Sequence, residues 1–554
     1  MGIEHGREID EHAQLDCDVC IVGGGAAGIA VALELARDAL SVILLESGDW
    51  KLDPQTQALY EGQVEQPALH DPPQLNRARR FGGSTTVWVG RCVPFDAIDF
   101  ERRDYVPHSG WPFGIDELLP FYLRANSICE AGEYVYRAAD ALPSARRAMI
   151  EGFASSRVNT DGLERFSRPT DFGRRYRRVL EQARHLRVVL GANCLDLSAC
   201  KDSSSISHAV VSTLGGRRFT IRARQFVLAA GALEVTRLLL ASRSVYPNGI
   251  GNDRDQVGRF YMCHIAGRVG RLEFDAAPSR VFNGYERCPD GVYCRRRLQL
   301  AADVQRSLGI GNLVARVHHP AIPDPSHRTG PLSALYLARH IVPAQFRKRV
   351  TSDDRSLALW ARHVRNVIAD PLDTARFLSH WVARRTLASR KFPTVVVSPK
   401  SQRYTLDFHA EQVPQPNSRV SLTDECDCLG LPRLRIDWRY SAMDVRTVAE
   451  SLRVLAEEFE RTNVGRLTFD DAEVEQAIRS EGAYAGHHIG TTRMSDSPAD
   501  GVVDRNCRVH GLRNLFIASS SVFPTSSQAN PTLTIVALAL RLAEHLKSTS
   551  TRHV

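Results

Sequence analysis

The sequence predicts an α/β fold in which a nucleotide-binding domain is combined with a second, sheet-based domain of the α+β type. Two observations carry this prediction. The first is a strand–glycine loop–helix–strand unit at residues 18–46. The second is a return to short strands after residue 186, followed by a strand-rich stretch at 266–440 that a helical segment at about 331–390 interrupts. This alternation indicates that the second domain is threaded through a discontinuous first domain.

The N-terminal unit has the glycine pattern of a dinucleotide-binding loop. It consists of the strand Asp18–Val22, the loop Gly23-Gly-Gly-Ala-Ala-Gly28, a helix from Ile29 to about Arg37, and the strand Ser41–Leu45, which ends in Glu46. Gly23 and Gly25 let the backbone approach a pyrophosphate, Gly28 permits close packing of helix on strand, and Glu46 stands where a carboxylate would accept ribose hydroxyls. The unit predicts a Rossmann-like domain, but it does not separate NAD from FAD.

Further segments of the sequence support the predicted α/β fold. The run Arg79–Arg91 places two glycines and small hydroxyl residues before Val87-Trp-Val89, a segment we expect to be buried. Strands are expected at Arg187–Leu190, Ser207–Val211, Arg218–Ile221 and Gln225–Gly231, the last opening into a helix at Ala232–Ser242. A long amphipathic helix is expected at Met443–Thr462. No second dinucleotide fingerprint follows, which disfavours a flavoprotein with its own NADPH domain.

Composition excludes several classes of protein. The 554 residues contain no apolar stretch near the ~18 residues of a membrane-spanning helix, and the start of the chain is polar and acidic. We therefore expect a cytoplasmic protein. The twelve cysteines form no disulfide framework or metal-ligand spacing, so structural thiols and no metal are expected.

The basic charge is concentrated in residues 331–391, which hold 12 Arg or Lys and 4 Asp or Glu, a balance of +8. Two amphipathic helices are expected there. Their apolar sides would carry Leu357, Trp360, Val364 and Val367 on one helix and Leu378, Trp381 and Val382 on the other, with Arg347-Lys-Arg349, Arg362, Arg365, Arg384 and Arg385 on the polar sides. A cover over the active site, a subunit contact in a homo-oligomer, and peripheral docking to a membrane or an acidic partner all fit this pattern. Nucleic acid lacks any supporting motif.

The C-terminal 70 residues combine histidines that are candidates for a general base with an asparagine amide at the start of a helix. Gly486-His-His-Ile-Gly-Thr-Thr-Arg-Met494 precedes a strand at Asn514–Ala518, and Asn530-Pro531 opens a helix at Ile535–Leu546. A histidine is a natural general base near neutral pH, and an asparagine amide orients a hydroxyl without titrating.

These segments resemble the glucose–methanol–choline (GMC) family of FAD-dependent alcohol oxidoreductases. The resemblance also covers Gly82-Gly83-Ser84, Gly231–Leu240, Gln256–Arg259, Glu411-Gln412 and Ser418–Val420, in the order of the family. Only residues 266–400 lack a clear counterpart. The C-terminal motifs are most similar to those of the sugar-oxidising branch that includes pyranose oxidases.

The resemblance implies a site and a fold. The fold is the FAD-binding type of GMC and glutathione-reductase-like proteins, with its FAD domain at 13–135, 185–265 and 481–548, a linker or substrate-domain part at 136–184, and a substrate domain at 266–480 that contains the 331–391 insertion. Catalytic positions fall on His487 and Asn530, with His488 as neighbour. Motifs and resemblance together place FAD on Gly23, Gly25, Ala26, Ala27, Gly28, Glu46, Arg80, Gly82, Gly83, Ser84, Thr85, Thr86, Trp88, Val89, Ala230, Gly231, Ser519, Ser520, Asn530, Pro531 and Thr532.

Three departures from relatives matter. Val87 stands where covalent-FAD pyranose oxidases have a histidine, so non-covalent FAD is expected. Val89 replaces a frequent threonine, and Ser519 replaces an aspartate.

The expected activity is oxidation of an alcohol, such as a sugar, glycoside or polyol, with hydride transfer to flavin N5 and reoxidation by oxygen or a quinone-like acceptor. The alternatives are a non-redox lyase on the same scaffold and a flavoprotein that docks through 331–391, which would be peripherally membrane-associated.

Overall fold

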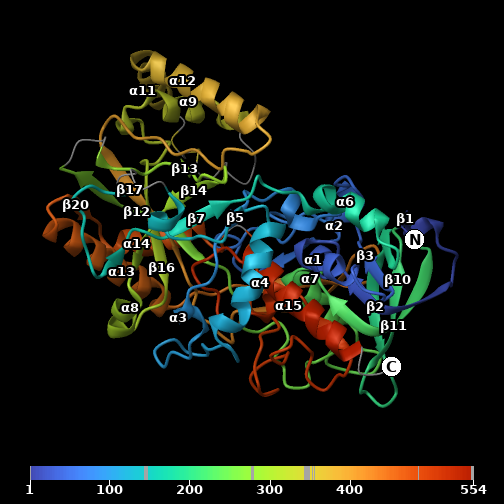
Figure 1. Cartoon of the computed structure of the whole chain (residues 1–554). Coiled ribbons are helices and arrows are strands. Elements are labelled where there is room, and N and C mark those ends of the chain that lie inside the picture. The colour runs from blue at the N-terminus through green and yellow to red at the C-terminus, as the bar shows by residue number, and fades with distance from the viewer. Residues whose placement is uncertain are drawn as a thin grey trace.

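The computed structural model describes residues 2–142, 148–275, 280–341, 350–351, 354, 356–484 and 486–550 (Figure 1). It confirms the α/β fold and the Rossmann-like domain with a second, sheet-based domain. The basic run Arg347–Arg349 lies outside the described residues.

An eight-stranded sheet forms the nucleotide-binding side of the molecule. Its order is β1-β8-β3-β2-β11-β10-β9, and β21 pairs with β11 beside β10. The strands are β1 (Ile3–His5), β2 (Gln14–Val22), β3 (Val42–Leu45), β8 (Leu186–Leu190), β9 (Asn193–Ala199), β10 (Ile206–Ser212), β11 (Arg218–Leu228) and β21 (Leu515–Ile517). The ladders from β1 to β11 and from β11 to β21 are parallel, whereas β9 and β10 are antiparallel.

Two features of this sheet differ from the sequence-based expectation. The strands expected at 218–221 and 225–231 form one strand, β11, because its first half pairs with β10 and its second half pairs with β21. The sheet also begins earlier than residue 13, because β1 pairs with β8. The core of the sheet is apolar, as the continuously buried Val19–Val22 run requires for a parallel sheet covered on both faces.

Among the described residues, eight helices lie before residue 265 or at the C-terminal end of the chain. They are α1 (Ala26–Leu35), α2 (Pro54–Ala58), α3 (Ala97–Phe100), α4 (Ile115–Ile128), α5 (Ala138–Ala141), α6 (Phe172–Gln182), α7 (Ala232–Ala241) and α15 (Thr532–Ser550), with 3₁₀ turns η1 (Gly6–Glu8), η2 (Gly83–Thr86) and η7 (Ser520–Val522). The C-terminal α15 packs on the N-terminal α1 and on α4.

The second domain is built on a six-stranded antiparallel sheet in the order β20-β12-β17-β16-β15-β6. These strands are β6 (Val158–Asn159), β12 (Ile265–Phe274), β15 (Leu298–Leu300), β16 (Leu313–His318), β17 (Arg403–Ala410) and β20 (Gly465–Thr468). A four-stranded sheet holds β5 (Arg91–Cys92), β7 (Leu163–Phe166), β13 (Glu286–Arg287) and β14 (Tyr293–Arg296). A three-stranded sheet holds β4 (Gly62–Val64), β18 (Arg419–Cys426) and β19 (Pro432–Asp437).

Helix α13 (Ala442–Arg461) shows how the second core forms. Ser441 and Asp444 make a reciprocal capping box at its start. Val448, Leu452, Leu455 and Phe459 recur at helical spacing and are all buried in the second hydrophobic core. The other helices of this part are α8 (Ala302–Leu308) and α14 (Asp471–Glu481).

The insertion expected at 331–391 is helical. Its described elements are α9 (Gly330–Leu337), α11 (Leu357–Ala369), α12 (Pro371–Trp381) and a π-helical turn η6 (Val382–Leu387), next to the 3₁₀ turns η4 (Pro325–His327) and η5 (Arg339–Ile341). Figure 1 shows α9, α11 and α12 gathered at one extremity of the molecule, beyond the sheets. No helix among the described residues is both long enough and apolar enough to cross a bilayer.

Candidate active site

The predicted dinucleotide loop joins β2 to α1. Gly23 has φ +113°, and a Cβ atom on Gly28 would lie 1.9 Å from the carbonyl oxygen of Gly23. Glycine is therefore required at both positions, which brings the start of α1 against the strand. Ala26 and Ala27 form the first turn of α1, and no side chain caps that turn. Its free N–H groups and positive dipole end suit a pyrophosphate.

The second glycine loop contacts the first. Gly82 and Gly83 both have positive φ, and a Cβ atom on Gly83 would lie 3.0 Å from the Cα atom of Gly25. Two stretches of side-chain-free backbone thus face each other, as a cradle for a large flat ligand requires. The hydroxyls of Thr85 and Thr86 donate to Gly82 and Gly83 and hold the turn η2.

The remaining residues of this second loop lie around its rim. Arg80 donates to the carbonyl of Trp50, and Ser84 is exposed. The Val-Trp-Val segment was expected to be buried, and this is wrong for Val87, whose side chain is 41% exposed. Trp88 and Val89 are half-buried, and the Trp88 indole donates to the carbonyl of Thr170 at 3.0 Å.

Glu46 closes the loop at the end of β3. Its carboxylate accepts from the backbone N–H of Gly24 at 2.9 Å and of Gly48 at 2.7 Å. Burial raises the pKa of this carboxyl, and the two backbone donors oppose the rise. The side chain thus orders the loop and stands at the strand end, where a ribose would lie.

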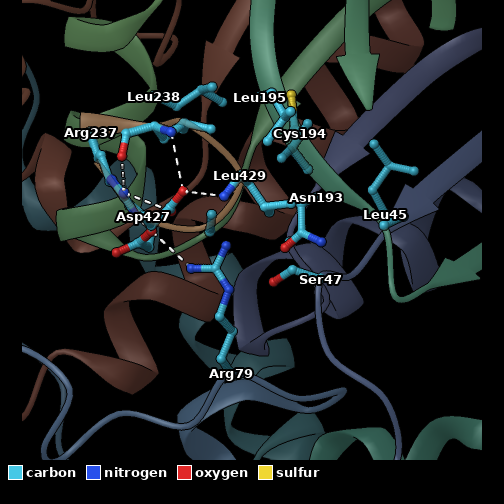
Figure 2. A pocket seen from close by; sticks show the side chains of 16 residues that line it. Leu45, Ser47, Arg79, Asn193, Cys194, Leu195, Arg237, Leu238, Asp427 and Leu429 are labelled. Atoms are coloured by element: carbon cyan, nitrogen blue, oxygen red, sulfur yellow. Dashed lines mark hydrogen bonds and ion pairs between the residues drawn. The ribbon is translucent and has the colours of Figure 1, made fainter. Parts of the chain in front are cut away.

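A narrow pocket adjoins this strand end (Figure 2). Figure 2 shows Leu45, Ser47, Asn193 and Cys194 on one side and the Arg237–Asp427 ion pair, 2.8 Å between its charged atoms, on the other. Ala230 also lines the pocket. The Asn193 side chain donates to Ser212, while its Oδ1 atom is buried without a hydrogen-bond partner. An unpaired acceptor in this position fits the adenosine end of a dinucleotide.

Gly231, with φ +82°, is the N-cap residue of α7, and no atom of the described residues beyond its chain neighbours lies within 4 Å of where its Cβ would be. Two residues into α7, Glu234 pairs with Arg77 and Arg79. Burial would raise the pKa of Glu234, but Arg79, Arg237 and Arg77 overcome this and hold it at about 2. Glu234 is therefore a charged anchor between α7 and the Arg79 loop.

Gly25 provides a test of ligand contact that does not perturb the protein itself. Its backbone angles, φ −85° and ψ −165°, suit any residue, and the nearest atom to an added Cβ is 4.0 Å away. We expect Gly25→Ala to fold normally yet lose cofactor affinity by about tenfold or more, because the methyl group would meet the pyrophosphate. Cofactor retention on gel filtration measures this.

Gly114→Ala is the matched control. Gly114 also precedes a helix, with φ −88° and ψ 173°, and nothing lies within 4 Å of its added Cβ. If both variants retain the cofactor equally, the pyrophosphate is not at Gly25.

The catalytic candidates His487 and Asn530 meet although 43 residues separate them. Asn530 Nδ2 lies 3.0 Å from His487 Nε2. Asn530 is half-buried, Pro531 and Thr532 follow it into α15, and the Asn530 Oδ1 atom is buried without a hydrogen-bond partner. His487 is half-buried, so its ring is both shielded and accessible.

Two further histidines surround His487 and had no signal in the sequence. His264 Nδ1 lies 2.9 Å from His487 Nδ1, and the His409 ring stacks on His264 with centroids 4.3 Å apart. They come from the start of β12 and from β17. Tyr484 packs against both His409 and His487.

The partners of these rings determine their tautomers. His264 Nε2 faces the carbonyl of Ser526 at 3.2 Å and must donate, so the neutral ring has a bare Nδ1. His487 Nδ1 must therefore carry the proton in the His264–His487 hydrogen bond. This leaves a lone pair on His487 Nε2, which accepts from the Asn530 amide. The fold thus prepares His487 Nε2 as a base.

Electrostatics keep His487 neutral. Burial lowers its pKa well below the usual value of 6.5, and His264 and Arg91 lower it further. Burial likewise lowers the pKa of His264 to about 3, which keeps that ring a neutral acceptor.

His488 points into a separate network. Its Nδ1 atom lies 2.6 Å from the Tyr261 hydroxyl, which also lies 2.7 Å from His70 Nε2. Ser520 donates to the His488 carbonyl at 2.6 Å, and Ser519 caps the turn η7. His488 and Ser520 therefore position the segment that carries His487.

Two groups of side chains bring potential metal ligands within 4.8 Å of one another in the described part of the chain. One is His264, His409 and His487, and the other is His70, Cys263 and His488. The hydrogen bonds described above engage both groups, and we assign no metal to them.

Comparison with known proteins identifies the family of the chain. Residues 18–395 match the FAD dependent oxidoreductase family, and residues 414–539 match the GMC oxidoreductase family. Paromamine 6'-oxidase of Streptomyces fradiae is 24% identical over 595 residues, covering 97% of this chain and 93% of the relative. The fructose dehydrogenase large subunit of Gluconobacter japonicus is 23% identical over 615 residues, covering 96% and 97%. The crystal structure of pyridoxine 4-oxidase from Mesorbium loti shares the fold, with a TM-score of 0.57, 20% identity, and coverage of 96% of this chain and 99% of that chain.

The chain belongs to the FAD-dependent oxidoreductases. Within them it is a GMC oxidoreductase, an enzyme that uses FAD to oxidise the CH–OH group of an alcohol. The glycine cradle, the uncapped start of α1 and the carboxylate of Glu46 fit FAD. The comparisons give no support to the lyase alternative.

Proposed function

We propose that this enzyme oxidises a hydroxyl group of a sugar, glycoside or other polyol to an aldehyde or ketone, with His487 as the base and Asn530 as the orienting group. One observation carries the proposal. The half-buried His487 Nε2 and Asn530 Nδ2 atoms lie 3.0 Å apart, so one hydroxyl group can reach both of them.

The two side chains divide the work on the substrate. The substrate hydroxyl replaces the Asn530 amide at His487 Nε2, which then takes the hydroxyl proton, and the released amide N–H of Asn530 holds the substrate oxygen. As His487 becomes charged, its Nδ1–H stays bonded to the bare Nδ1 of His264. Bound FAD supplies the acceptor for the hydride of the carbinol carbon.

The cofactor is proposed to be non-covalent, because Val87 offers no nucleophile where covalent relatives have histidine. Dioxygen or a quinone-like acceptor takes up the two electrons removed from the alcohol. The small-molecule partner of the enzyme is the alcohol substrate.

The proposed substrate class rests on the relatives and on the polarity of the site. Two of them are named for paromamine and fructose. Polar side chains cluster in the segment just before Asn530. There the Gln528 side chain accepts from Arg297 at 3.3 Å and donates to Asp96 at 3.0 Å. Such groups suit a substrate that carries several hydroxyls.

The direct test is anaerobic mixing of the holoenzyme with a panel of sugars, glycosides, polyols and simple alcohols. We expect loss of the oxidised flavin absorbance near ~450 nm with polyhydroxylated substrates. Bleaching by simple alcohols alone would overturn the substrate class, and no bleaching by any alcohol would overturn the function.

His264 is proposed as the positioning residue for the base. In His264→Leu the His487 proton loses its acceptor and can move to Nε2, which removes the lone pair that the reaction needs. We expect kcat to fall roughly 10- to 100-fold with little change in KM, because substrate binding does not depend on the tautomer. Steady-state kinetics with a reactive polyol measure this.

His264→Gln is the matched control, because its amide oxygen can accept from His487 Nδ1. It should recover part of the lost kcat. Equal losses in both variants would show that His264 matters only for packing.

A further inference from the structure

The insertion presents an apolar face to solvent. The described chain has fifteen exposed large apolar side chains, and seven of them lie within residues 357–387. The four most exposed of all fifteen are Leu357, Leu387, Ile368 and Leu372, at 70–85% exposure, whereas those outside the insertion do not exceed 51%. Such concentration marks an interaction surface rather than the scattered apolar residues of an ordinary surface.

Helix α11 shows that this exposure follows from a defined packing. Its inward face is buried at Leu359, His363, Asn366 and, just beyond the helix end, Asp370. Its outward face carries Leu357, Ala361, Val364 and Ile368. Both sets have the spacing i, i+4, i+7, i+11, and the two-residue offset between them rotates them by about 200°. The outward face is therefore apolar where a solvent-facing helix is normally polar.

The inward face is firmly held. His363 bonds the Ser333 hydroxyl at 3.0 Å, and Asn366 donates to the carbonyl of Pro325 at 2.8 Å. Asp370 accepts from Lys400 at 2.6 Å. These contacts fix the rotation of α11, so the apolar residues cannot turn inward without breaking buried hydrogen bonds.

Helix α12 and the turn η6 also carry exposed apolar side chains. Leu372, Leu378, Val382 and Leu387 are exposed, at 70%, 50%, 50% and 75%. Trp381, which the sequence placed on this apolar side, instead lies half-buried near Phe377. We call the outward side chains Leu357, Trp360, Ile368, Leu372, Leu378, Val382 and Leu387 the apolar insertion face.

Cations border this face. At 100° per residue, Arg365 lies about 70° and Arg362 about 130° from the mean direction of the outward stripe of α11, on the same flank, and the exposed Arg384 lies in η6. None of the three forms a salt bridge with a described residue. Long arginine side chains beside leucine and tryptophan match an interface in which apolar groups enter lipid and cations meet headgroups.

We propose that the apolar insertion face docks the enzyme on an anionic lipid bilayer. The charge favours lipid over a second copy of the chain, because a two-fold dimer would bring the same exposed arginines toward each other. An anionic headgroup layer complements them. The placement of α11 and α12 at one extremity lets them reach a flat surface (Figure 1). This inference does not depend on the proposed substrate.

The test uses the holoenzyme and vesicles of phosphatidylcholine with or without about 30% phosphatidylglycerol. We expect flotation with the anionic vesicles and weak flotation with pure phosphatidylcholine. Two variants probe the two components: Leu357→Ser/Ile368→Ser/Leu372→Ser, and Arg362→Gln/Arg365→Gln/Arg384→Gln. Each should weaken binding to anionic vesicles by about tenfold or more while turnover of a soluble alcohol stays unchanged.

Leu52→Ser/Leu123→Ser/Leu214→Ser is the matched control, because these leucines are exposed elsewhere, at 50%, 51% and 36%. The control should bind vesicles like the wild type. The proposal fails if the wild type does not float with anionic vesicles, or if both insertion variants still bind fully. It also fails if sedimentation shows a dimer that the leucine variant abolishes without any vesicle binding.

Discussion

Replacing His487 by alanine should slow reduction of the bound flavin by an alcohol about 10²- to 10⁴-fold, the range of general base catalysis. The substrate hydroxyl would then have to lose its proton without an acceptor at Nε2, since the neighbouring rings are arranged around His487 and not in its place. Anaerobic stopped-flow absorbance measures the reduction rate. Flavin content and thermal unfolding confirm that the variant is intact.

His208→Ala is the control, since His208 is a half-buried histidine of β10 outside this group of rings, bonded to Ser207. It should reduce its flavin at the wild-type rate. Reduction of His487→Ala at that same rate would remove His487 from the mechanism.

The wild-type pH profile provides a second readout of the same base. Because the pKa of His487 lies well below 6.5, the base stays unprotonated as the pH falls from 8 to 6.5. The rate of flavin reduction should therefore not change between pH 8 and 6.5 through titration of this base.

Mild acid should destabilise the fold strongly. Burial lowers the pKa of seven buried histidines, in three of them to about 3 or 4: His264, His318, His319, His327, His363, His409 and His488. Below pH ~6.5 these histidines bind protons in the unfolded chain but stay neutral in the folded chain. The free energy of unfolding therefore decreases as the pH falls. Each ring contributes up to about 1.4 kcal/mol per pH unit.

Three buried carboxyls act in the opposite direction. Burial raises the pKa of Glu46 and Asp99, and that of Asp444 to about 6, so the folded chain takes up their protons first. Seven histidines against three carboxyls leave a net loss of several kcal/mol between pH ~6.5 and ~5, comparable with the ~5–15 kcal/mol that stabilises a typical domain.

Thermal unfolding followed by circular dichroism at pH 7.5 and 5.0 measures the effect, and Tm should be clearly lower at pH 5.0. His319→Gln should reduce the difference between the two values. His12→Gln, at a histidine whose side chain is 84% exposed, should leave it unchanged. Equal Tm values at both pH values in the wild type would contradict the prediction.

Local sequence was sufficient where a motif and its flanking elements coincide. The β2–α1–β3 unit and its glycines could be predicted because strand, turn and helix requirements act on neighbouring residues. His487 and Asn530 were also accessible, because each belongs to a short motif and the resemblance connected the two.

The rest of the site depends on long-range packing. His264 and His409 come from separate strands of the six-stranded sheet, and nothing in the residues around them distinguishes a tautomer-setting histidine from a core one. Asn193 lines the pocket of Figure 2 only because β9 begins beside the end of β3. Val87 was misjudged because an apolar triplet does not reveal which of its side chains faces solvent.

The pairing of β21 with β11 and the packing of α15 on α1 have a consequence for biosynthesis. The nucleotide-binding sheet receives its β21 strand, and the helix α1 its cover, from the last forty residues of the chain. A nascent chain on the ribosome therefore holds the glycine loop long before it holds the parts that complete it. Loading of the yellow cofactor must wait until β21 and α15 have been synthesised, and a product terminated before them would be released colourless.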